Sequence, residues 1–334
     1  MLNQFRALDM SELCEKLSKN CNTLILFHAR PDADAVGSAF ALRELLYAMG
    51  IPAMCACSDE VPERLQFLSY AMQGSVVFDE DMKLDFDRVI SVDSASPSQL
   101  GSMFDRVRKD VDIMIDHHGK GSIYADNYID PDAAATGEII YEIAKKLLAD
   151  GKISAIPHRA IQCIYAALSS DTGCFKFSNT TPRTHRLAAE LLEAGADALY
   201  INHMLYESKS KLQLKAEGEA ARRLNVYADG RVASVLIPYS VKCELGLLDE
   251  HLETVIDIPR SVAGVEVAFV VKQPEDKNFF RVSMRSSSDF DVSEICARFG
   301  GGGHIRASGC GIEAPDIETA EKLILNEINK KIDG

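Results

Sequence analysis

The chain has 334 residues, of which 47% are hydrophobic and 26% charged, and its 50 acidic residues outnumber its 36 basic ones. This composition is typical of a folded globular protein and excludes a collagen-like or disordered chain, while the length predicts two domains at roughly 100–200 residues each. The net charge of −14 argues against a protein that coats long DNA or RNA through a broad basic surface, although a small anionic substrate can still bind at a local site.

From this sequence we expect neither a signal peptide nor a metal-binding pair of cysteines. The first ten residues, MLNQFRALDM, show no basic segment followed by an apolar core. No apolar run is long enough to cross a bilayer, so we expect a cytoplasmic protein with no membrane partner. The nine cysteines form no CxxC motif, which predicts that most of them are reduced and buried. We expect no functional role for Cys55 and Cys57.

The first half of the chain alternates apolar, β-rich runs with segments of helical periodicity. Strands are expected at residues 23–28, 53–58, 88–93 and 111–116. A helix that ends at Gly50 follows the first strand, and further helices are expected near residues 135–149, 159–169 and 184–194. This alternation predicts a parallel sheet with right-handed crossovers. Such sheets bind their ligands at the carboxyl ends of the strands.

The second half of the chain begins with a long, charged and helix-prone segment. We expect a first domain at residues 1–204, a connecting helix at 205–225 and a second domain at 226–334. Strands are expected at 232–238, 265–272 and 280–285, followed by a helix at 292–299, a glycine run at 300–303 and a terminal helix at 317–331. The second domain is therefore predicted to be a smaller α/β domain.

Imidazoles and carboxylates follow the ends of four predicted elements. They are His28, Asp32, Asp34, Asp93, Asp116, His117, His118 and Asp171. Each has a common structural explanation when taken alone, since an aspartate before a helix is usually its N-cap. Taken together, at least four acids at one sheet edge without compensating lysines or arginines would repel one another unless cations lay between them.

The types of ligand indicate which cations these would be. Carboxylates mixed with imidazoles favour manganese, or magnesium less well, whereas a structural zinc site prefers thiolates. Two ions about 3.5–4 Å apart generate hydroxide at neutral pH and bind a phosphate group. The predicted reaction is therefore phosphoester hydrolysis.

The same residues lie in motifs that resemble the DHH/DHHA1 phosphoesterases. The four N-terminal motifs are HARPDADAVGS, SVDSAS, IDHHGKG and SSDTGCFKFSNTTPRTHRLAAELLEAGAD, and the C-terminal one is SMRSSSDFDVSEICARFGGGGHIRASG. The resemblance covers nearly the whole chain and is strongest to the oligoribonuclease (nano-RNase) and pAp-phosphatase branch. It implies an N-terminal parallel-sheet DHH domain that a helical connector joins to a smaller α/β DHHA1 domain.

The resemblance also implies a role for each polar residue of the first domain. His28, Asp32 and Asp93 would hold one metal ion, and Asp34, Asp93, His117 and Asp171 would hold the second, so that Asp93 bridges the two ions. Asp116 would orient an imidazole, and His118 would face the substrate phosphate. The implied catalytic residues are Asp93, Asp116 and His118. Outside this set, Ser38 either caps a helix or binds a carboxylate, and Thr136 is expected to be a helix cap.

Additional positive charge has to come from the second domain. Two divalent ions, four aspartates and a bridging hydroxide sum to about −1, so further cations are needed to attract a phosphodiester. Arg285 and His304 are the natural donors. The glycines before His304 (Gly301, Gly302 and Gly303) either form a flexible turn or bring backbone N–H groups to a phosphate, and the family motif favours the second role. Arg306 either adds a phosphate contact or points to solvent.

These observations predict a hydrolase that uses two Mn²⁺ ions, with Mg²⁺ as the alternative. It would cleave RNA of about two to five nucleotides to mononucleotides and dephosphorylate 3′-phosphoadenosine 5′-phosphate (pAp) to AMP. The expected partners are short single-stranded RNA, dinucleotides and pAp, and no long duplex; a homodimer is left open. The alternatives are a cyclic- or linear-dinucleotide phosphodiesterase, and with less support a single-strand DNA exonuclease, an inorganic pyrophosphatase or a non-catalytic nucleotide sensor.

Overall fold

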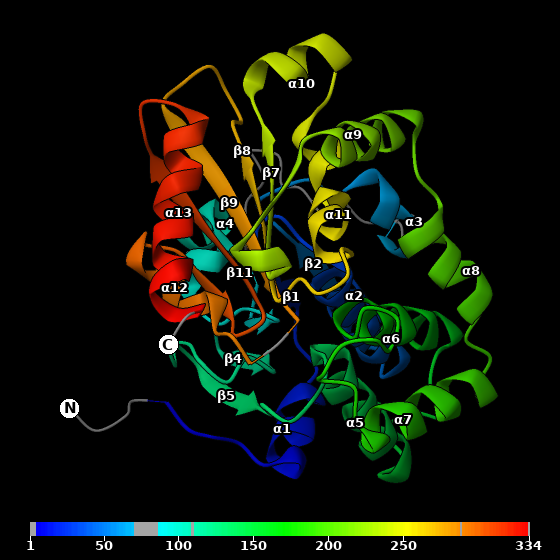
Figure 1. The fold of residues 1–334 in the computed structure, drawn as a ribbon. Helices are drawn as coiled ribbons and strands as arrows, with labels where there is room; N and C mark the ends of the chain where they lie inside the picture. The colour runs from blue at the N-terminus through cyan, green and yellow to red at the C-terminus, as the bar shows by residue number, and fades with distance from the viewer. Residues whose placement is uncertain (1–4, 70–85, 108–109, 288, 333–334) are drawn as a thin grey trace. The chain divides into compact units, whose positions relative to one another are not determined.

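The computed structural model of the chain (Figure 1) describes residues 5–69, 86–107, 110–287 and 289–332. The chain divides into two units, Met1–Ser208 and Lys209–Gly334. Each unit has its own sheet and its own hydrophobic core.

The sheet of the first unit is parallel throughout its described strands. The spatial order is β2-β1-β3-β4-β5, and each neighbouring pair is parallel. The strands are β1 (Thr23–Leu26), β2 (Ala53–Ala56), β3 (Arg88–Val92), β4 (Ile113–Asp116) and β5 (Asp126–Ile129). The predicted parallel sheet is therefore confirmed, and β5, which the sequence did not predict, extends it at one edge.

Helices cover both faces of this sheet. The longer ones are α1 (Met10–Leu17), α2 (Ala33–Ala48), α5 (Thr136–Ala149), α6 (His158–Asp171) and α7 (Pro182–Glu193). The shorter ones are η1 (Glu63–Leu65), α3 (Gln66–Ser69), η2 (Pro97–Leu100), α4 (Ser102–Arg106), α8 (Ala198–Asn202) and the π-helical turn η3 (His203–Glu207).

Helix α2 lies at the centre of the larger core, and its sequence explains part of this position. Nearly every residue from Ala33 to Leu46 is buried, because α2 packs against the sheet, α5 and α6. A side chain at Gly37 would begin 2.5 Å from the carbonyl oxygen of Cys163. This glycine therefore allows the close approach of α2 to α6, which brings the start of α2 beside the sheet edge.

The second unit has a mixed sheet with the order β10-β11-β9-β8-β7-β6, in which β7 and β8 are parallel and the other neighbouring pairs are antiparallel. The strands are β6 (Leu224–Tyr227), β7 (Val232–Ile237), β8 (Val267–Lys272), β9 (Phe279–Ser286), β10 (Gly302–His304) and β11 (Ala307–Glu313). The helices are α9 (Lys211–Arg222), η4 (Ala228–Gly230), α10 (Tyr239–Leu245), η5 (Asp249–Leu252), η6 (Thr254–Ile256), α11 (Asp257–Arg260), α12 (Val292–Arg298) and α13 (Ile317–Ile332).

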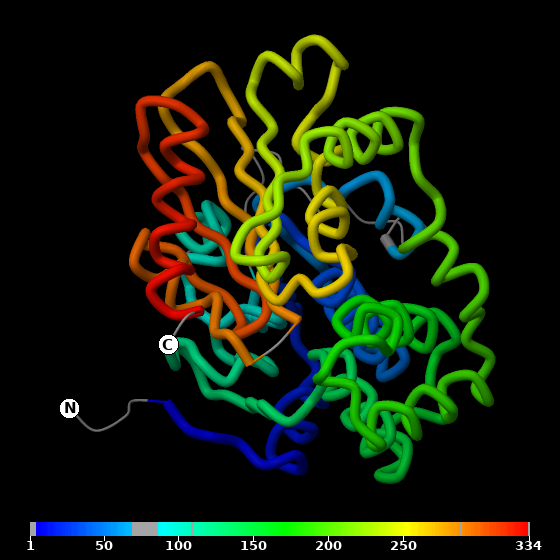
Figure 2. The backbone as a smooth tube through the Cα atoms, viewed as in Figure 1, coloured from blue at the N-terminus to red at the C-terminus, as the bar shows by residue number. Residues whose placement is uncertain are grey.

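Two predicted segments of this unit differ in extent from the structure. The helix expected over residues 205–225 occupies Lys211–Arg222, because Ser210 caps its start and Leu224 begins β6. The second half of the glycine run lies in β10, which pairs with β11. The chain path from β9 through α12, β10 and β11 to α13 is visible as the orange-to-red tube in Figure 2.

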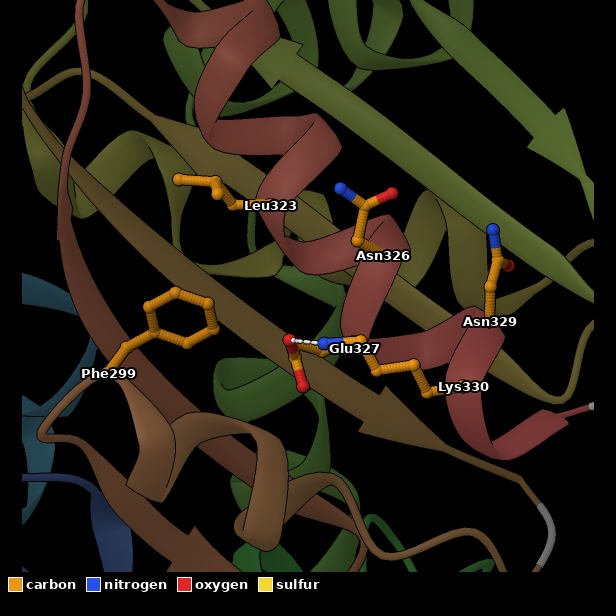
Figure 3. Close-up of a pocket in the computed structure, with 6 residues that line it drawn as sticks. All are labelled: Phe299, Leu323, Asn326, Glu327, Asn329 and Lys330. Atoms are coloured by element: carbon orange, nitrogen blue, oxygen red, sulfur yellow. Dashed lines mark hydrogen bonds and ion pairs between the residues drawn. The ribbon is translucent and has the colours of Figure 1, made fainter.

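A shallow hollow of about 620 Å³ lies on the surface of α13 (Figure 3). Its lining consists of Phe299, Leu323, Asn326, Glu327, Asn329 and Lys330. Glu327 forms ion pairs with Arg298 and Lys330. The carboxylate of this hollow is therefore already neutralised, and the hollow lacks the groups that the predicted chemistry needs.

Within the described residues, no helix is both long and apolar enough to span a bilayer.

Candidate active site

The loop between β1 and α2 places an imidazole between two carboxylates. His28 Nε2 lies 3.7 Å from Asp32 Oδ1 and 3.5 Å from Asp93 Oδ2. His28 Nδ1 lies 2.9 Å from the carbonyl oxygen of Ala29, and since a carbonyl only accepts, this contact places the proton on Nδ1. Nε2 is then the ring atom that faces the carboxylates, and it is the atom that a metal ion would bind after displacing its proton.

Asp32 is also the N-cap of α2, where its Oδ1 accepts the N–H groups of Asp34 and Ala35 at 3.0 Å each. The capping interpretation and the metal-ligand interpretation are therefore compatible, because one carboxylate oxygen fixes the side chain while the group remains beside His28. The cap also sets the direction in which α2 leaves the sheet edge.

A second imidazole lies among Asp93 and two further carboxylates. His117 Nε2 is 3.8 Å from Asp34 Oδ2, 3.7 Å from Asp93 Oδ1 and 3.3 Å from Asp171 Oδ2. His117 Nδ1 lies 3.2 Å from the carbonyl oxygen of Ala133, so this ring also keeps its proton on Nδ1. Asp171, expected just after a helix, is the last residue of α6.

Asp34 is fully buried and is held by three donors. Its Oδ1 accepts the hydroxyl of Ser38 at 2.8 Å and the N–H of Gly137 at 3.0 Å, and its Oδ2 accepts the N–H of Thr136 at 2.7 Å. Two of these donors are backbone groups at the start of α5, where the helix dipole also favours a negative charge. Of the two roles open to Ser38, the structure shows hydrogen bonding to a carboxylate.

Thr136 is not the helix cap that its position suggested. The N-cap of α5 is Ala135, and the Thr136 hydroxyl instead donates to Asp93 Oδ1 at 3.0 Å. The reason is that the start of α5 lies beside the end of β3, so the hydroxyl reaches the carboxylate of Asp93. Asp93 itself has φ of 53°, a left-handed conformation directly after β3 that turns its side chain back over the strand end.

Asp116 ends β4 and organises the histidines that follow it. Its Oδ1 accepts the N–H of His117 at 2.8 Å and lies 2.7 Å from His118 Nδ1. Its Oδ2 is buried and has no hydrogen-bond partner among the described residues. A buried carboxylate oxygen without a donor is costly, so a bound cation or water is the natural partner for it.

The electrostatics of the cluster show a deficit of positive charge. Burial, together with the neighbouring charge of Asp93, raises the pKa of Asp34 to about 7. Burial and nearby carboxylates also raise the pKa of Asp171. Burial lowers the pKa of His28, but Asp32 and Asp93 outweigh it and hold that pKa above its usual value. The cluster therefore retains protons that a divalent cation would displace.

The possible ligand atoms of the first unit form three groups whose members lie within 4.8 Å of one another. The groups are His28, Asp32 and Asp93; Asp34, Asp93 and His117; and Asp93, Asp116 and His118. Asp93 belongs to all three of these groups. Mixed carboxylate and imidazole donors in adjacent groups with one shared carboxylate match the donor set of a site for two divalent ions.

The predicted substrate residues of the second unit lie together on its sheet. Arg285 on β9 and His304 on β10 are both register partners of Ala307 on β11, so all three side chains share one face. Gly302 lies on the same face, since it pairs with Gly309, which in turn pairs with Ser283. This face is opposite the one on which α12 and α13 cover Met284.

Several other polar residues have partners that the sequence did not reveal. Arg306 forms an ion pair of 2.9 Å with the exposed Asp289. Arg183 is paired with Asp130 at 2.8 Å, and His185 stacks on the ring of Phe175 with centroids 5.5 Å apart.

Asn179 was not singled out from the sequence. Its amide group donates to the carbonyl oxygens of Ala134 and Asp171 at 3.0 Å each. It therefore ties the loop beside His117 to the helix end that carries Asp171. Only its position inside the fourth motif could have indicated this role.

Two family models match the chain. Residues 22–168 match the DHH family, N-terminal domain, and residues 234–332 match the DHHA1 domain. A bifunctional oligoribonuclease and PAP phosphatase from Thermus thermophilus is 27% identical to this chain over 92% of the chain and 89% of that protein. A cyclic-di-AMP phosphodiesterase from Listeria monocytogenes is 24% identical over 95% of the chain and 49% of that protein.

Among solved structures, an exopolyphosphatase-related protein from Bacteroides fragilis has the same fold, with a TM-score of 0.87, 22% identity and coverage of 98% of both chains. The two matched domains, in this order, confirm the architecture that the motifs predicted. The chain belongs to the DHH/DHHA1 family of metal-dependent phosphoesterases and resembles the bifunctional oligoribonuclease and PAP phosphatases within it.

Proposed function

We propose that the chain hydrolyses very short RNA to mononucleotides and dephosphorylates pAp to AMP, using two manganese ions. The observation that carries this proposal is that Asp93 is shared by two groups of possible ligands. Its Oδ2 lies 3.5 Å from His28 Nε2, and its Oδ1 lies 3.7 Å from His117 Nε2. The names of relatives such as the Thermus thermophilus protein support the choice of substrates.

The first unit would supply the metal ligands. His28, Asp32 and Asp93 would hold one ion, and Asp34, Asp93, His117 and Asp171 would hold the other. Two divalent ions bound there would supply an activated water and neutralise the phosphate oxygens. The residues themselves contribute a fixed geometry, because the backbone carbonyls of Ala29 and Ala133 set the tautomers of both imidazoles.

Asp116 and His118 would act on the substrate side of this site. Asp116 is fully buried, and its short contact to His118 Nδ1 fixes the orientation of that ring. Burial disfavours a charged His118, but the carboxylate of Asp116 outweighs it and raises the pKa of the imidazole to about 9 in the metal-free protein. His118 can therefore present a hydrogen-bond donor to a phosphate oxygen.

The second unit would bind the phosphate groups of the substrate. Arg285 and His304 share one face of the sheet across Ala307, and a guanidinium can bind a phosphate through two parallel hydrogen bonds. Gly301, Gly302 and Gly303 would let backbone N–H groups reach a phosphate oxygen. The acidic chain offers no basic tract for a longer strand, which favours substrates of only a few nucleotides.

A turnover panel tests the proposal. We would compare pAp, ribonucleotides of two to five residues, a single-stranded 24-mer and inorganic pyrophosphate in the presence of Mn²⁺, with Asp93→Asn as the inactive control. The expected result is high kcat/KM on pAp and on the short ribonucleotides with a sharp fall for the 24-mer. Equal or higher kcat/KM on the 24-mer would contradict the short-substrate assignment, and activity on pyrophosphate alone would contradict both substrates.

A second candidate is hydrolysis of cyclic or linear dinucleotides. The similarity to a cyclic-di-AMP phosphodiesterase over 95% of this chain favours it. Cyclic di-AMP and its linear product pApA therefore belong in the same panel. A kcat/KM on cyclic di-AMP above that on pAp would select this candidate.

A further inference from the structure

Asp93, the proposed bridging ligand, has a strained backbone. Its φ of 53° is left-handed, and a residue other than glycine keeps this conformation only where the surrounding structure holds it. The N–H of Asp93 donates to the carbonyl oxygen of Ile115 at 3.0 Å, which continues the pairing of β3 with β4. The hydroxyl of Thr136 binds only the carboxylate of Asp93. The backbone that follows Asp93 therefore needs a support of its own.

The hydroxyl of Tyr124 bonds to the chain on both sides of Asp93. It donates to the carbonyl oxygen of Ser94 at 2.9 Å, and it lies 2.5 Å from Oγ of Ser91. Because the single proton of the phenol goes to the carbonyl, Ser91 is the donor in the second contact. Ser91 lies two positions before Asp93 and Ser94 directly after it, and both serines are fully buried. A chain of two hydrogen bonds thus spans the strained residue.

The segment that carries Tyr124 packs on the same loop through other contacts. The N–H of Ser122 donates to the carbonyl oxygen of Ala95 at 2.8 Å, and a methyl group on Gly121 would lie 2.3 Å from that oxygen. The ring of Tyr124 packs against the cluster of buried side chains that includes Met114 of β4. These contacts do not involve the phenolic hydroxyl, so Tyr124→Phe isolates the effect of that one group.

We propose that Tyr124 is a positioning residue of the metal site, whose hydroxyl holds Asp93 in the conformation that both ions need. In this conformation Oδ2 of Asp93 lies 3.5 Å from Nε2 of His28, and Oδ1 lies 3.7 Å from Nε2 of His117. Without the hydroxyl, the carbonyl and the serine bonded to it lose their partner, and Asp93 relaxes towards negative φ. This turns the carboxylate away from the two imidazoles, so both ions are held more weakly.

A matched control separates this role from a general loss of stability. Tyr227 of the second unit donates its hydroxyl to Oε1 of Glu321 at 2.9 Å, and it is also partly buried. Tyr227→Phe therefore removes the same group from the unit that holds none of the proposed metal ligands. Ser91→Ala is a weaker form of the main change, because the hydrogen bond from Tyr124 to Ser94 remains.

The experiment compares the wild type, Tyr124→Phe, Ser91→Ala and Tyr227→Phe, each as the full chain. Mn²⁺ affinity is measured by calorimetry on the metal-free proteins, and their Tm by circular dichroism. The kcat and KM for pAp are then measured at saturating Mn²⁺. The kinetic part of the test rests on the proposed function, whereas calorimetry needs no substrate.

In Tyr124→Phe we expect the Mn²⁺ affinity to fall by about tenfold or more, and kcat to fall with an unchanged KM for pAp. Ser91→Ala should show a smaller loss of both affinity and kcat. Tyr227→Phe should lower the Tm without changing either quantity. An unchanged Mn²⁺ affinity in Tyr124→Phe, or an equal loss in Tyr227→Phe, would overturn the positioning role. A wild type that binds Mn²⁺ but does not hydrolyse pAp would contradict the proposed function and leave the calorimetric test of Tyr124 intact.

Discussion

Neighbouring glycines in the run before His304 should respond in opposite ways to the same substitution. A methyl group on Gly301 would lie 2.1 Å from the carbonyl oxygen of Gly309 and 2.6 Å from Cβ of Cys310. On Gly302 it would meet no described atom within 4 Å, and Gly302 is not among the described residues with positive φ. Gly301→Ala is therefore expected to disturb the fold, whereas Gly302→Ala should not.

The size of the effect follows from what the methyl group would meet. The contact at Gly301 is with backbone of a paired strand, which cannot rotate away as a side chain can. Overpacking of this kind costs typically 1–3 kcal/mol, and a backbone contact this short indicates the upper end. A loss of about 3 kcal/mol lowers the Tm of a domain of this size by roughly 10 °C. Gly302→Ala should change stability by at most about 0.5 kcal/mol.

Substrate binding, unlike stability, should be sensitive to the substitution at Gly302. The methyl group that Gly302→Ala introduces would lie on the face that carries Arg285 and His304, where the proposed phosphate contacts lie. Gly302→Ala is therefore expected to raise KM for pAp by about tenfold with an unchanged Tm. Thermal unfolding by circular dichroism and steady-state kinetics measure the two effects. A Tm loss in Gly302→Ala equal to that in Gly301→Ala, or an unchanged KM, would refute the assignment of this face.

Four further experiments test the proposed site. Asp93→Asn removes charge from both ion positions. The metal content measured by mass spectrometry should therefore fall sharply, and kcat should fall by about a thousandfold or more. A variant that keeps its metal and its activity would contradict the bridging role. Arg285→Ala and His304→Ala should each raise KM by about tenfold with full metal content, and loss of metal in either would refute the division between the units. Thr136→Val removes the hydroxyl bonded to Asp93 at constant size and should weaken Mn²⁺ binding by about tenfold in calorimetry, whereas Thr136→Ser should restore it. The pKa of Asp34 in the metal-free protein is about 7, so Asp34 binds a proton below this pH. The affinity for Mn²⁺ should therefore fall as the pH drops from about 8 to 6, and ion binding should release protons into the buffer. An affinity that does not depend on pH would contradict the assignment.

Three of the strands that were predicted correctly share one physical property. β1, β3 and β4 are buried on both faces at every position, and such strands appear in a sequence as continuous apolar runs. β5 and β6 lie at sheet edges and are only partly buried, so their sequences contain polar residues and give no such signal. β11 is interrupted by two glycines, and it exists because β9 pairs with it along its full length.

The residues of the candidate site also divide into those that the sequence predicts and those that it does not. Carboxylates and imidazoles at strand ends could be predicted, because the carboxyl ends of parallel strands meet at one edge. The residues that hold them could not. Thr136 and Asp93 are 43 positions apart, and Asn179 and Ala134 are 45 apart. These contacts depend on the packing of α5 and α6 against the sheet, which no local pattern in one sequence records.

Asp34 shows why this site and its cation depend on each other. Three donors stabilise its carboxylate, and hydrogen bonds of this kind ordinarily lower a pKa. Its pKa is nevertheless about 7 in place of 3.8, because burial and the charge of Asp93 outweigh the donors. That difference is roughly 4 kcal/mol against the charged form. A divalent ion beside Asp34 supplies the attraction that the donors cannot, since it interacts with both carboxylates at once. The charged carboxylate of Asp34 is therefore disfavoured unless a cation is bound. The burial that fixes the geometry of the site is thus also the reason that the site favours a bound ion.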